Sequence, residues 1–199
     1  IIDLVTEMDR ASEKHIMRII QSAFPEHGVQ SEESPLINPK ASLRWIIDPL
    51  DGTLNFVHGV PFFAISIGLA HLDTPIIGVI YDPIRKELFK AAAGCGAQLN
   101  GHAMRVSKTA RLSRALLSTG FGYDFRKRPS SYLAGFGLLQ MRSHGVRRMG
   151  SSALSFAYVA SGREDAFYEQ RLFPWDLAAG AVLVQEAGGV QTALDGRPH

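Results

Sequence analysis

Hydrophobic and polar positions alternate along the first part of the chain with the period of an amphipathic helix. Between residues 3 and 24, apolar side chains recur mostly every three or four positions, at Leu4, Met8, Ala11, Ile16, Ile19, Ile20 and Ala23. This spacing places them on one face of a helix. Pro25 lacks a backbone N–H and cannot continue the pattern. The sequence therefore predicts a helix over 3–24, followed by a loop over 28–40.

Short apolar runs predict strands in much of the remaining chain. Residues 63–72 and 75–81 are rich in Ile and Val and are separated by a two-residue polar turn, which is the pattern of a β-hairpin. A strand over 44–47 is expected to end at the next residue, because Pro49 removes a ladder donor. Further strands are predicted over 86–92, 114–119 and 164–168, and one is expected to begin near Val190.

Longer apolar patterns predict helices in the second half of the chain. Helices are expected over 130–142 and 177–187, and a strand, a turn and a helix are expected in that order from about 146 to 162, with loops over 94–104 and 124–131. Gly188-Gly189 provides a C-terminal stop for the last helix. Hairpins mixed with several helices indicate an α+β fold, with layered α and β elements and much antiparallel pairing.

Composition limits the classes of protein to which the chain can belong. Its 199 residues fit one domain, and 46% hydrophobic with 20% charged residues is ordinary for a globular protein. A net charge of +2 is too small for a dedicated nucleic-acid binder, although a pI near 8.8 leaves room for a local basic patch. Cys95 is the only cysteine, so no intramolecular disulfide can form. We therefore expect a cytoplasmic protein, and no apolar run is long enough to cross a membrane.

Several carboxylates stand in tight turns flanked by apolar residues. Asp48 and Asp51 follow a buried strand, Glu32 and Glu33 lie in a loop upstream, and Asp176 precedes an apolar helix. Taken singly, each has a simple interpretation as a turn residue, a helix cap or part of a solvated loop. Gathered in one place, they would repel one another without a cation. A hard divalent ion with oxygen ligands, such as Mg²⁺, is the natural partner.

Two glycine-containing turns add donors to this picture. Gly52-Thr53 follows the acidic pair, and its backbone N–H groups form an anion site if a helix begins there. Thr53 is also a candidate cap for that helix. The segment Gly150-Ser151-Ser152-Ala153 is a similar strand-to-helix turn, for which an ordinary serine cap is an equally good interpretation.

Two blocks of the sequence resemble a known family. The segments WIIDPLDGTLNF (45–56) and PWDLAAGAVLVQEAGG (174–189) are similar to the paired signatures of the inositol monophosphatase family, which are Mg²⁺-dependent, lithium-sensitive phosphatases. The resemblance covers essentially the whole chain. Supporting blocks follow in the family's order at 3–6 with Asp9, 31–34, 150–153 and 167–169.

The resemblance implies a fold and an extent. It implies one catalytic domain over 1–199, folded as a layered α/β/α/β sandwich of the sugar-phosphatase type, with sub-layers near 1–113 and 114–199. The chain starts at Ile1 without a Met and stops at His199, and it lacks the family's first helix and its last strand and helix. We therefore expect a piece of a longer protein, truncated at both ends.

The resemblance also implies roles at matching positions. Glu32 and Asp48, with the carbonyl of Leu50, resemble the ligands of a first metal ion, and Asp48, Asp51 and Asp176 resemble those of a second. Further roles are implied for Asp9 near a third, weaker ion, for Thr53 as the hydroxyl that orients the attacking water with Glu32 as its base, for the Gly52 and Thr53 amides as the phosphate cradle, and for Asp51, Ser152, Glu169 and Asp176 as substrate contacts.

The implied reaction is hydrolysis of myo-inositol monophosphate, or of a similar polyol phosphate, by a metal-activated water. Two or three Mg²⁺ ions and a homodimer are implied with it. Ser31 stands where the family usually has Gly, and Leu54 where it often has Thr, but neither departure removes a ligand. Cys95 is interpreted as a packed or loop thiol and not as a nucleophile.

Other interpretations stay open at this point. The substrate could instead be fructose-1,6-bisphosphate, histidinol phosphate or 3′-phosphoadenosine 5′-phosphate. The basic run Arg126-Lys127-Arg128 and the pair Arg147-Arg148 suit RNA or the transcription machinery, although a solvated surface explains them as well. A third reading is an inactive fragment that only binds metal.

Overall fold

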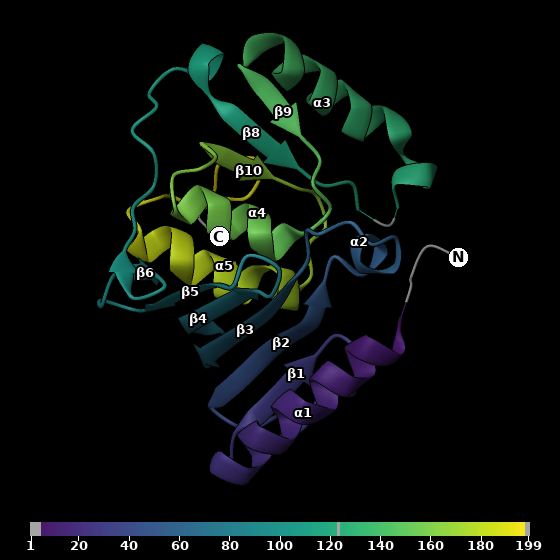
Figure 1. Ribbon diagram of the computed structural model, residues 1–199, viewed down its shortest axis with the longest axis vertical. Coiled ribbons are helices and arrows are strands. Elements are labelled where there is room, and N and C mark those ends of the chain that lie inside the picture. The colour runs from purple at the N-terminus through teal and green to yellow at the C-terminus, as the bar shows by residue number, and fades with distance from the viewer. Residues whose placement is uncertain (1–4, 123, 198–199) are drawn as a thin grey trace.

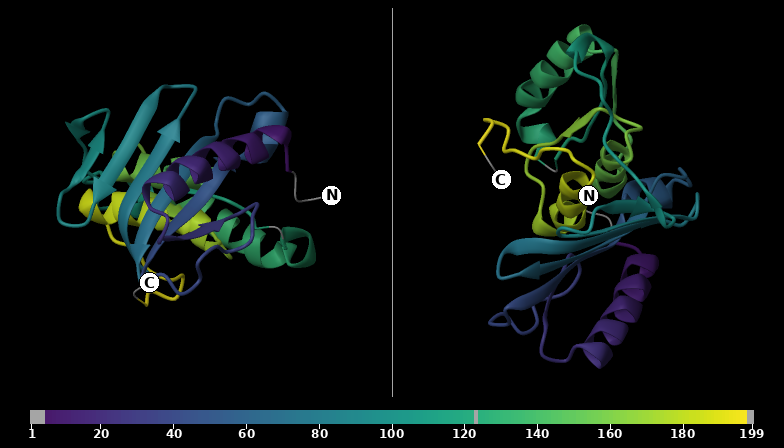
Figure 2. Two further views of the ribbon diagram at one scale, coloured as in Figure 1. Left: turned by 90° about the horizontal axis from the view of Figure 1, so that it is seen from below. Right: turned by 90° about the vertical axis from the view of Figure 1, so that its left-hand side faces the viewer.

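The computed structural model describes residues 5–122 and 124–197, and these form a stack of layers (Figure 1). Helix α1 (Glu7–Ala23) covers one face of a seven-stranded sheet, and α4 (Ser152–Ala160) and α5 (Pro174–Glu186) lie on the other face. A three-stranded sheet follows, with α3 (Pro129–Arg142) outside it. The right-hand view of Figure 2 shows the layers edge-on. The expected α/β/α/β order is confirmed, and α3 adds an outer layer.

The large sheet is a meander with the order β1-β2-β3-β4-β5-β6-β7. Only the β1–β2 pair is parallel, and the predicted hairpin is the pair β3–β4. Three of the strands, β1, β6 and β7, fall in segments that were predicted to be loops. They have four, three and two residues (GVQS, AQL and HA), and none of them contains a run of Ile, Val or aromatic residues that would mark a strand. The strands are β1 (Gly28–Ser31), β2 (Leu43–Asp51), β3 (Ala64–His71), β4 (Thr74–Asp82), β5 (Glu87–Ala92), β6 (Ala97–Leu99) and β7 (His102–Ala103).

Strand β2 runs through Pro49, so the prediction that the strand ends before this proline is wrong. The pairing of β2 with β3 shifts register between Asp48 and Asp51. Such a bulge leaves a residue without a ladder partner, and a proline is tolerated there because no N–H is needed. The backbone N–H of Leu50 instead donates to Asp48 Oδ1 at 3.0 Å. The bulge therefore turns the end of the strand into a tight acidic corner.

Helix α1 begins with a capping box, in which Thr6 caps the helix and Asp9 accepts the backbone N–H of Thr6 at 2.7 Å. The helix ends at Ala23, two residues before the proline that was expected to stop it. Its apolar face packs through Ile16, Met17 and Ile20 on β1 and β2. Residues 3 and 4 of the predicted helix lie outside the described residues.

The main core lies between the large sheet and the pair α4–α5. Fully buried side chains such as Leu154 and Leu183 come from these two helices, and Ile80 and Phe89 come from the sheet. Helix α5 ends at Glu186, and the glycine that follows Ala187 has a positive φ, so the predicted stop is confirmed. The strand predicted near Val190 is not formed within the described residues.

The small sheet has the order β10-β8-β9, and all of its pairs are parallel. Its strands are β8 (Leu116–Thr119), β9 (Gly145–Arg147) and β10 (Ala166–Tyr168), and a 3₁₀ turn η1 (Leu112–Arg114) leads into β8. The outer face of this sheet is covered by α3, whose residues Phe136 and Leu139 contact the buried Ala115, Leu117 and Val146.

The segment 124–131 is not the solvated loop that was predicted. It contains a 3₁₀ turn η2 (Phe125–Lys127) and the beginning of α3. Asp124 accepts a hydrogen bond from the Tyr132 hydroxyl and forms an ion pair with Arg171 at 3.2 Å. The low hydrophobicity of this segment therefore reflects internal polar contacts as well as exposure.

In the part of the chain that the structure describes, no helix combines the length and the apolar character that a membrane span requires. The division of a single domain into sub-layers near residue 113 stays a prediction.

Candidate active site

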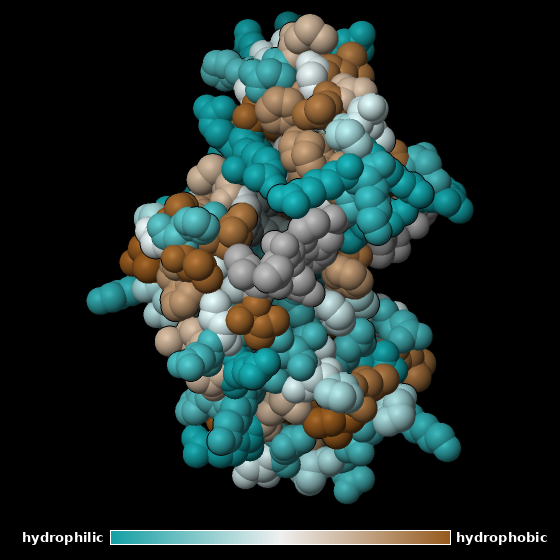
Figure 3. Space-filling view, turned by 90° about the vertical axis from the view of Figure 1, so that its right-hand side faces the viewer, coloured by the Kyte–Doolittle hydropathy of each residue, from teal (hydrophilic) through white to brown (hydrophobic). Residues whose placement is uncertain are grey.

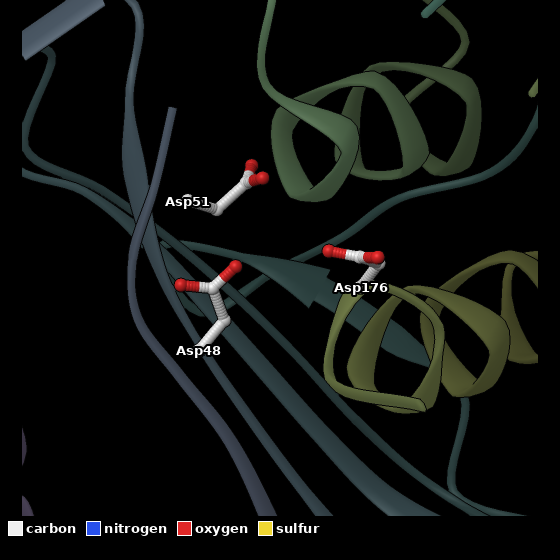
Figure 4. A group of neighbouring side chains, drawn as sticks. All are labelled: Asp48, Asp51 and Asp176. Carbon is white, nitrogen blue, oxygen red and sulfur yellow. The ribbon is translucent and has the colours of Figure 1, made fainter. Parts of the chain in front are cut away.

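The corner at the end of β2 faces the beginning of α5. Asp48 and Asp51 lie on either side of the bulge, and Asp176 lies in the first turn of α5. One carboxylate oxygen from each of the three lies within 4.8 Å of the others. Figure 4 shows the three side chains around a common space between the strand and the helix. The fold thus brings together three of the expected metal ligands.

Asp51 is fixed by the beginning of α4. Its carboxylate accepts hydrogen bonds from the Ser151 hydroxyl, from the Ala153 N–H at 2.8 Å and from the Ser152 hydroxyl at 3.2 Å. Ser151 is also the N-cap of α4, since its hydroxyl accepts the Leu154 N–H at 3.2 Å. Both interpretations of this turn are therefore correct: the serine caps a helix, and the helix end holds the aspartate.

Asp176 is not the N-cap that the sequence predicted. Helix α5 begins at Pro174, three residues earlier than expected, and Phe173 is the cap residue. Asp176 is in the first turn, where its Oδ2 accepts the Phe173 N–H at 2.6 Å. This bond orients the carboxylate at the helix end that faces Asp48 and Asp51.

A cavity of about 470 Å³ opens above the three aspartates. It is lined by residues from both sheets and from α2, α4 and α5. Asp9 and Glu33 do not line it, but every other residue that the sequence proposed for the site does: Glu32, Asp48, Leu50, Asp51, Gly52, Thr53, Ser152, Glu169 and Asp176. Glu32 follows β1 directly, and its N–H donates to the Ile47 carbonyl at 3.2 Å. Its side chain therefore stands beside β2.

Thr53 links Asp9 to the cavity. The Thr53 hydroxyl lies 3.1 Å from Asp9 Oδ1 and 3.0 Å from the Leu50 carbonyl oxygen. Thr53 is the first residue of the short helix α2 (Thr53–Val57), and Gly52, with φ of 95°, is its cap. The expectation that Thr53 caps this helix is therefore wrong, because a residue in the left-handed region is needed one position earlier.

Burial and mutual repulsion disfavour ionisation at the floor of the cavity. Burial, followed by the negative charge of Asp176, raises the pKa of Glu32 to about 8. Burial and the charge of Asp51 raise the pKa of Asp176 to about 7. For the same two reasons the pKa of Asp48 is held well above its ordinary value.

Asp51 and Glu169, which the sequence proposed as substrate contacts, show pKa shifts in the same direction. Burial raises the pKa of Asp51, although the hydrogen bonds from α4 oppose this shift. Burial and the charge of Asp176 raise the pKa of Glu169 to about 8. Arg148 opposes the shift at Glu169, which places a positive charge near this end of the cavity.

The floor of the cavity fits a hard divalent cation. Its donors are carboxylate oxygens, with the Leu50 carbonyl beside them, and Mg²⁺ prefers this set. Within residues 5–122 and 124–197, no lysine, arginine or histidine forms an ion pair with Glu32, Asp48, Asp51 or Asp176. Buried carboxylates without a positive partner either hold protons or bind a cation.

The rim of the cavity carries residues that the sequence analysis did not assign to this site. Arg126, Arg148 and Arg171 line it, and Arg148 lies over the ring of Phe121 at 5.0 Å from its centroid. Gly120 stands directly opposite the Glu169 carboxylate. These positions are far apart in the sequence, so only the fold reveals that they converge.

Known proteins are similar to this chain both in sequence and in fold. The sequence profile described as the inositol monophosphatase family matches residues 2–199. The chain is 46% identical over 200 residues to an inositol-1-monophosphatase of Synechocystis sp. and 46% identical over 199 residues to a Nus factor SuhB of Pseudomonas aeruginosa. Each alignment covers 98% of this chain, and they cover 69% and 73% of the two relatives.

A solved structure agrees with these sequence matches. The inositol monophosphatase from Anabaena (Nostoc) sp. PCC 7120 superposes with a TM-score of 0.94 at 47% identity, over 96% of this chain and 76% of that one. The α+β fold inferred from the sequence is confirmed. The chain belongs to the inositol monophosphatase family.

Proposed function

We propose that the chain is a Mg²⁺-dependent phosphomonoesterase that releases inorganic phosphate from myo-inositol monophosphate or a similar polyol phosphate. The observation that carries this proposal is the cavity, whose floor holds clustered carboxylates and whose wall holds Thr53, Ser152 and Glu169. Family membership and the name of the Synechocystis relative support the choice of reaction and substrate.

Glu32, Asp48, Asp51 and Asp176, with the Leu50 carbonyl, are the groups that would hold two Mg²⁺ ions, and a third ion is proposed near Asp9. When bound, such ions neutralise a phosphate ester and lower the pKa of a coordinated water. Burial, followed by the negative charge of Asp176, raises the pKa of Glu32, and bound cations would oppose the second of these effects. The Glu32 carboxylate can then accept a proton from the attacking water.

Thr53 orients that water through its hydrogen bonds. Its hydroxyl has one proton, which goes to Asp9 Oδ1 or to the Leu50 carbonyl, both of which lie within 3.1 Å. The lone pairs of the hydroxyl oxygen are then left to accept a hydrogen bond from the water. Asp9 contributes by keeping the Thr53 proton away from the cavity.

The far wall suits a substrate with several hydroxyl groups. Asp51 and Glu169 offer carboxylate oxygens that accept from hydroxyl donors, and the Ser152 hydroxyl can donate or accept. A polyol provides such donors on neighbouring carbons. The arginines of the rim provide the observation that favours an alternative substrate with a second anionic group, such as fructose-1,6-bisphosphate or 3′-phosphoadenosine 5′-phosphate.

The test compares phosphate release from a panel of esters with Mg²⁺ present. We expect myo-inositol monophosphate to be preferred, and Asp48→Asn and Asp176→Asn each to abolish release while the circular dichroism spectrum is kept. Asp73→Asn is the matched control, because the Asp73 side chain is 94% exposed and does not line the cavity. Near-normal turnover in folded Asp48→Asn protein contradicts the mechanism, and a strong preference for a nucleotide contradicts the substrate.

A second candidate function is binding to RNA or the transcription machinery. The observation that favours it is that the basic run Arg126-Lys127-Arg128 and the pair Arg147-Arg148 are exposed, and that Arg126 and Arg148 line the same cavity. Figure 3 shows a hydrophilic band on this side of the molecule, at the height of the beginning of α3. The Pseudomonas relative is named a Nus factor.

An RNA-retention assay on the unmodified chain tests this second candidate. Retention that falls steeply with salt and is lost in Arg126→Gln/Arg128→Gln protein supports it, because phosphate contacts release counterions. Retention that does not depend on these residues contradicts it. A homodimer and a cytoplasmic location stay predictions.

A further inference from the structure

Helix α1 turns three polar residues toward the strand that carries the candidate metal ligands. Asp9, Ser12 and Glu13 are three and four positions apart, so they share one face of the helix. Asp9 and Glu13 are only 1% and 6% exposed. Carboxylates are seldom buried to this degree without a partner. We call these three residues the polar stripe of α1.

Ser12 contacts the bulge of β2. Its hydroxyl donates to the Pro49 carbonyl oxygen at 2.9 Å. Pro49 lies within the register shift that separates Asp48 from Asp51, and its side chain is fully buried. Because the ladder with β3 is interrupted here, this peptide is held by the bond from α1 and by the bond from the Leu50 N–H to Asp48 Oδ1.

Glu13 contacts the segment that carries Glu32. Its Oε2 accepts the Ser34 hydroxyl at 2.7 Å, and its other carboxylate oxygen has no hydrogen-bond partner among the described residues. Ser34 lies two residues after Glu32, in a segment outside the helices and strands. The contact therefore ties an irregular segment to a rigid helix, next to the residue proposed as the base.

The third member of the stripe reaches the site through Thr53, as described above. One face of one helix thus contacts three segments of the site: the Glu32 segment, the bulge between Asp48 and Asp51, and the beginning of α2. Each contact comes from a different residue. An ordinary packing face of α1 would require apolar residues at these positions, as it has at Ile16 and Ile20.

We infer that Ser12 and Glu13 are positioning residues for metal binding, which hold the bulge and the Glu32 segment at the spacing that the ions require. This inference rests on the proposed function, because the ions are its object. Neither residue lines the cavity, so both act through the ligands. Residues that orient metal ligands typically change metal affinity by about 10–100-fold when they are removed.

The test is a calorimetric titration of the metal-free chain with Mn²⁺ alone. Ser12→Ala and Ser34→Ala are each expected to weaken Mn²⁺ binding by about 10-fold. Ser34→Thr keeps a hydroxyl and is expected to retain most of the affinity. Glu13→Gln keeps an acceptor for Ser34 and should bind Mn²⁺ more tightly than Glu13→Ala. Ser22→Ala, on the exposed side of the same helix, is the matched control and should not change binding.

Thermal unfolding of every variant separates positioning from simple stabilisation. If the unmodified chain binds no Mn²⁺, the proposed metal site is wrong and the inference falls with it. Suppose instead that Ser12→Ala and Ser34→Ala bind Mn²⁺ as tightly as the unmodified chain does and only lower the unfolding midpoint. The polar stripe is then structural, and the inference alone is overturned. Weaker binding by the alanine variants, with recovery in Ser34→Thr, supports it.

Discussion

At the scale of single residues, Gly120 leaves the space that the Glu169 carboxylate occupies. A Cβ atom built at this position would lie 2.0–2.1 Å from the carboxylate atoms of Glu169. Those atoms are the flexible end of a side chain, so Gly120→Ala should move Glu169 without unfolding the protein. If Glu169 binds a substrate hydroxyl, losing this charged hydrogen bond should raise KM for myo-inositol monophosphate by about 10-fold or more.

The control for this prediction is Gly137→Ala, since nothing lies within 4 Å of a Cβ built there. Steady-state kinetics and the unfolding midpoint are measured for both variants. An unchanged KM in Gly120→Ala protein would show that Glu169 does not contact the substrate, or that it adapts at no cost.

Only some of the contacts between site residues could be predicted from the sequence. The clustering of Asp48 and Asp51 follows from their spacing on one turn, and repulsion between them is enough to suggest a cation. The approach of Asp176 follows only from the resemblance to a family, because no local pattern places the first turn of α5 opposite β2. The partners of Asp51 on α4, and the link from Asp9 to Thr53, could not be predicted, since they depend on the packing of separate elements.

At the scale of elements, the hydrophobic pattern predicted the long elements and the short strands β8 and β10, and it missed β1, β6 and β7. Helix α1, the β3–β4 hairpin and helix α5 have enough residues for their period to be visible. The prediction ended strand β2 before Pro49, because the rule that proline ends a strand does not take a bulge into account. That error lies at the site itself. The irregular backbone that broke the pattern is the feature that turns two carboxylates toward the same space.

At the scale of the whole molecule, the cavity exists because two sheets of different construction meet. The large sheet supplies the aspartates from β2, and the small parallel sheet supplies the opposite wall near Gly120 and Glu169. Helices α4 and α5 lie between the sheets and direct their first turns at Asp51 and toward Asp48. The arrangement collects negative charge at one point, so the stability of the whole fold should depend on what neutralises that charge.

The pH dependence of stability follows from this arrangement. In the folded chain the pKa of Asp176 is about 7, and those of Glu32 and Glu169 are about 8, against ordinary values of 3.8 and 4.5. Between these ordinary values and about pH 8 the folded state therefore holds protons that the unfolded state has released. The contribution of these three groups to the free energy of unfolding is complete below their ordinary pKa values and is lost as pH rises through 7 and 8. The metal-free chain should accordingly unfold at a lower temperature at pH 8.5 than at pH 5.5.

A divalent cation should reverse this trend, because it replaces the protons as the neutralising charge. We expect Mg²⁺ to raise the unfolding midpoint much more at pH 8.5 than at pH 5.5, where protons compete for the same oxygens. Thermal unfolding with EDTA or with Mg²⁺ at both pH values measures the effect. Asp176→Asn removes one of the charges and should flatten the pH dependence in EDTA, whereas Asp73→Asn should not. If the unfolding midpoint of the metal-free chain rises between pH 5.5 and 8.5, the carboxylates are ionised and the protein itself neutralises them. The acidic floor would then not need a cation, and the proposed metal site would be contradicted.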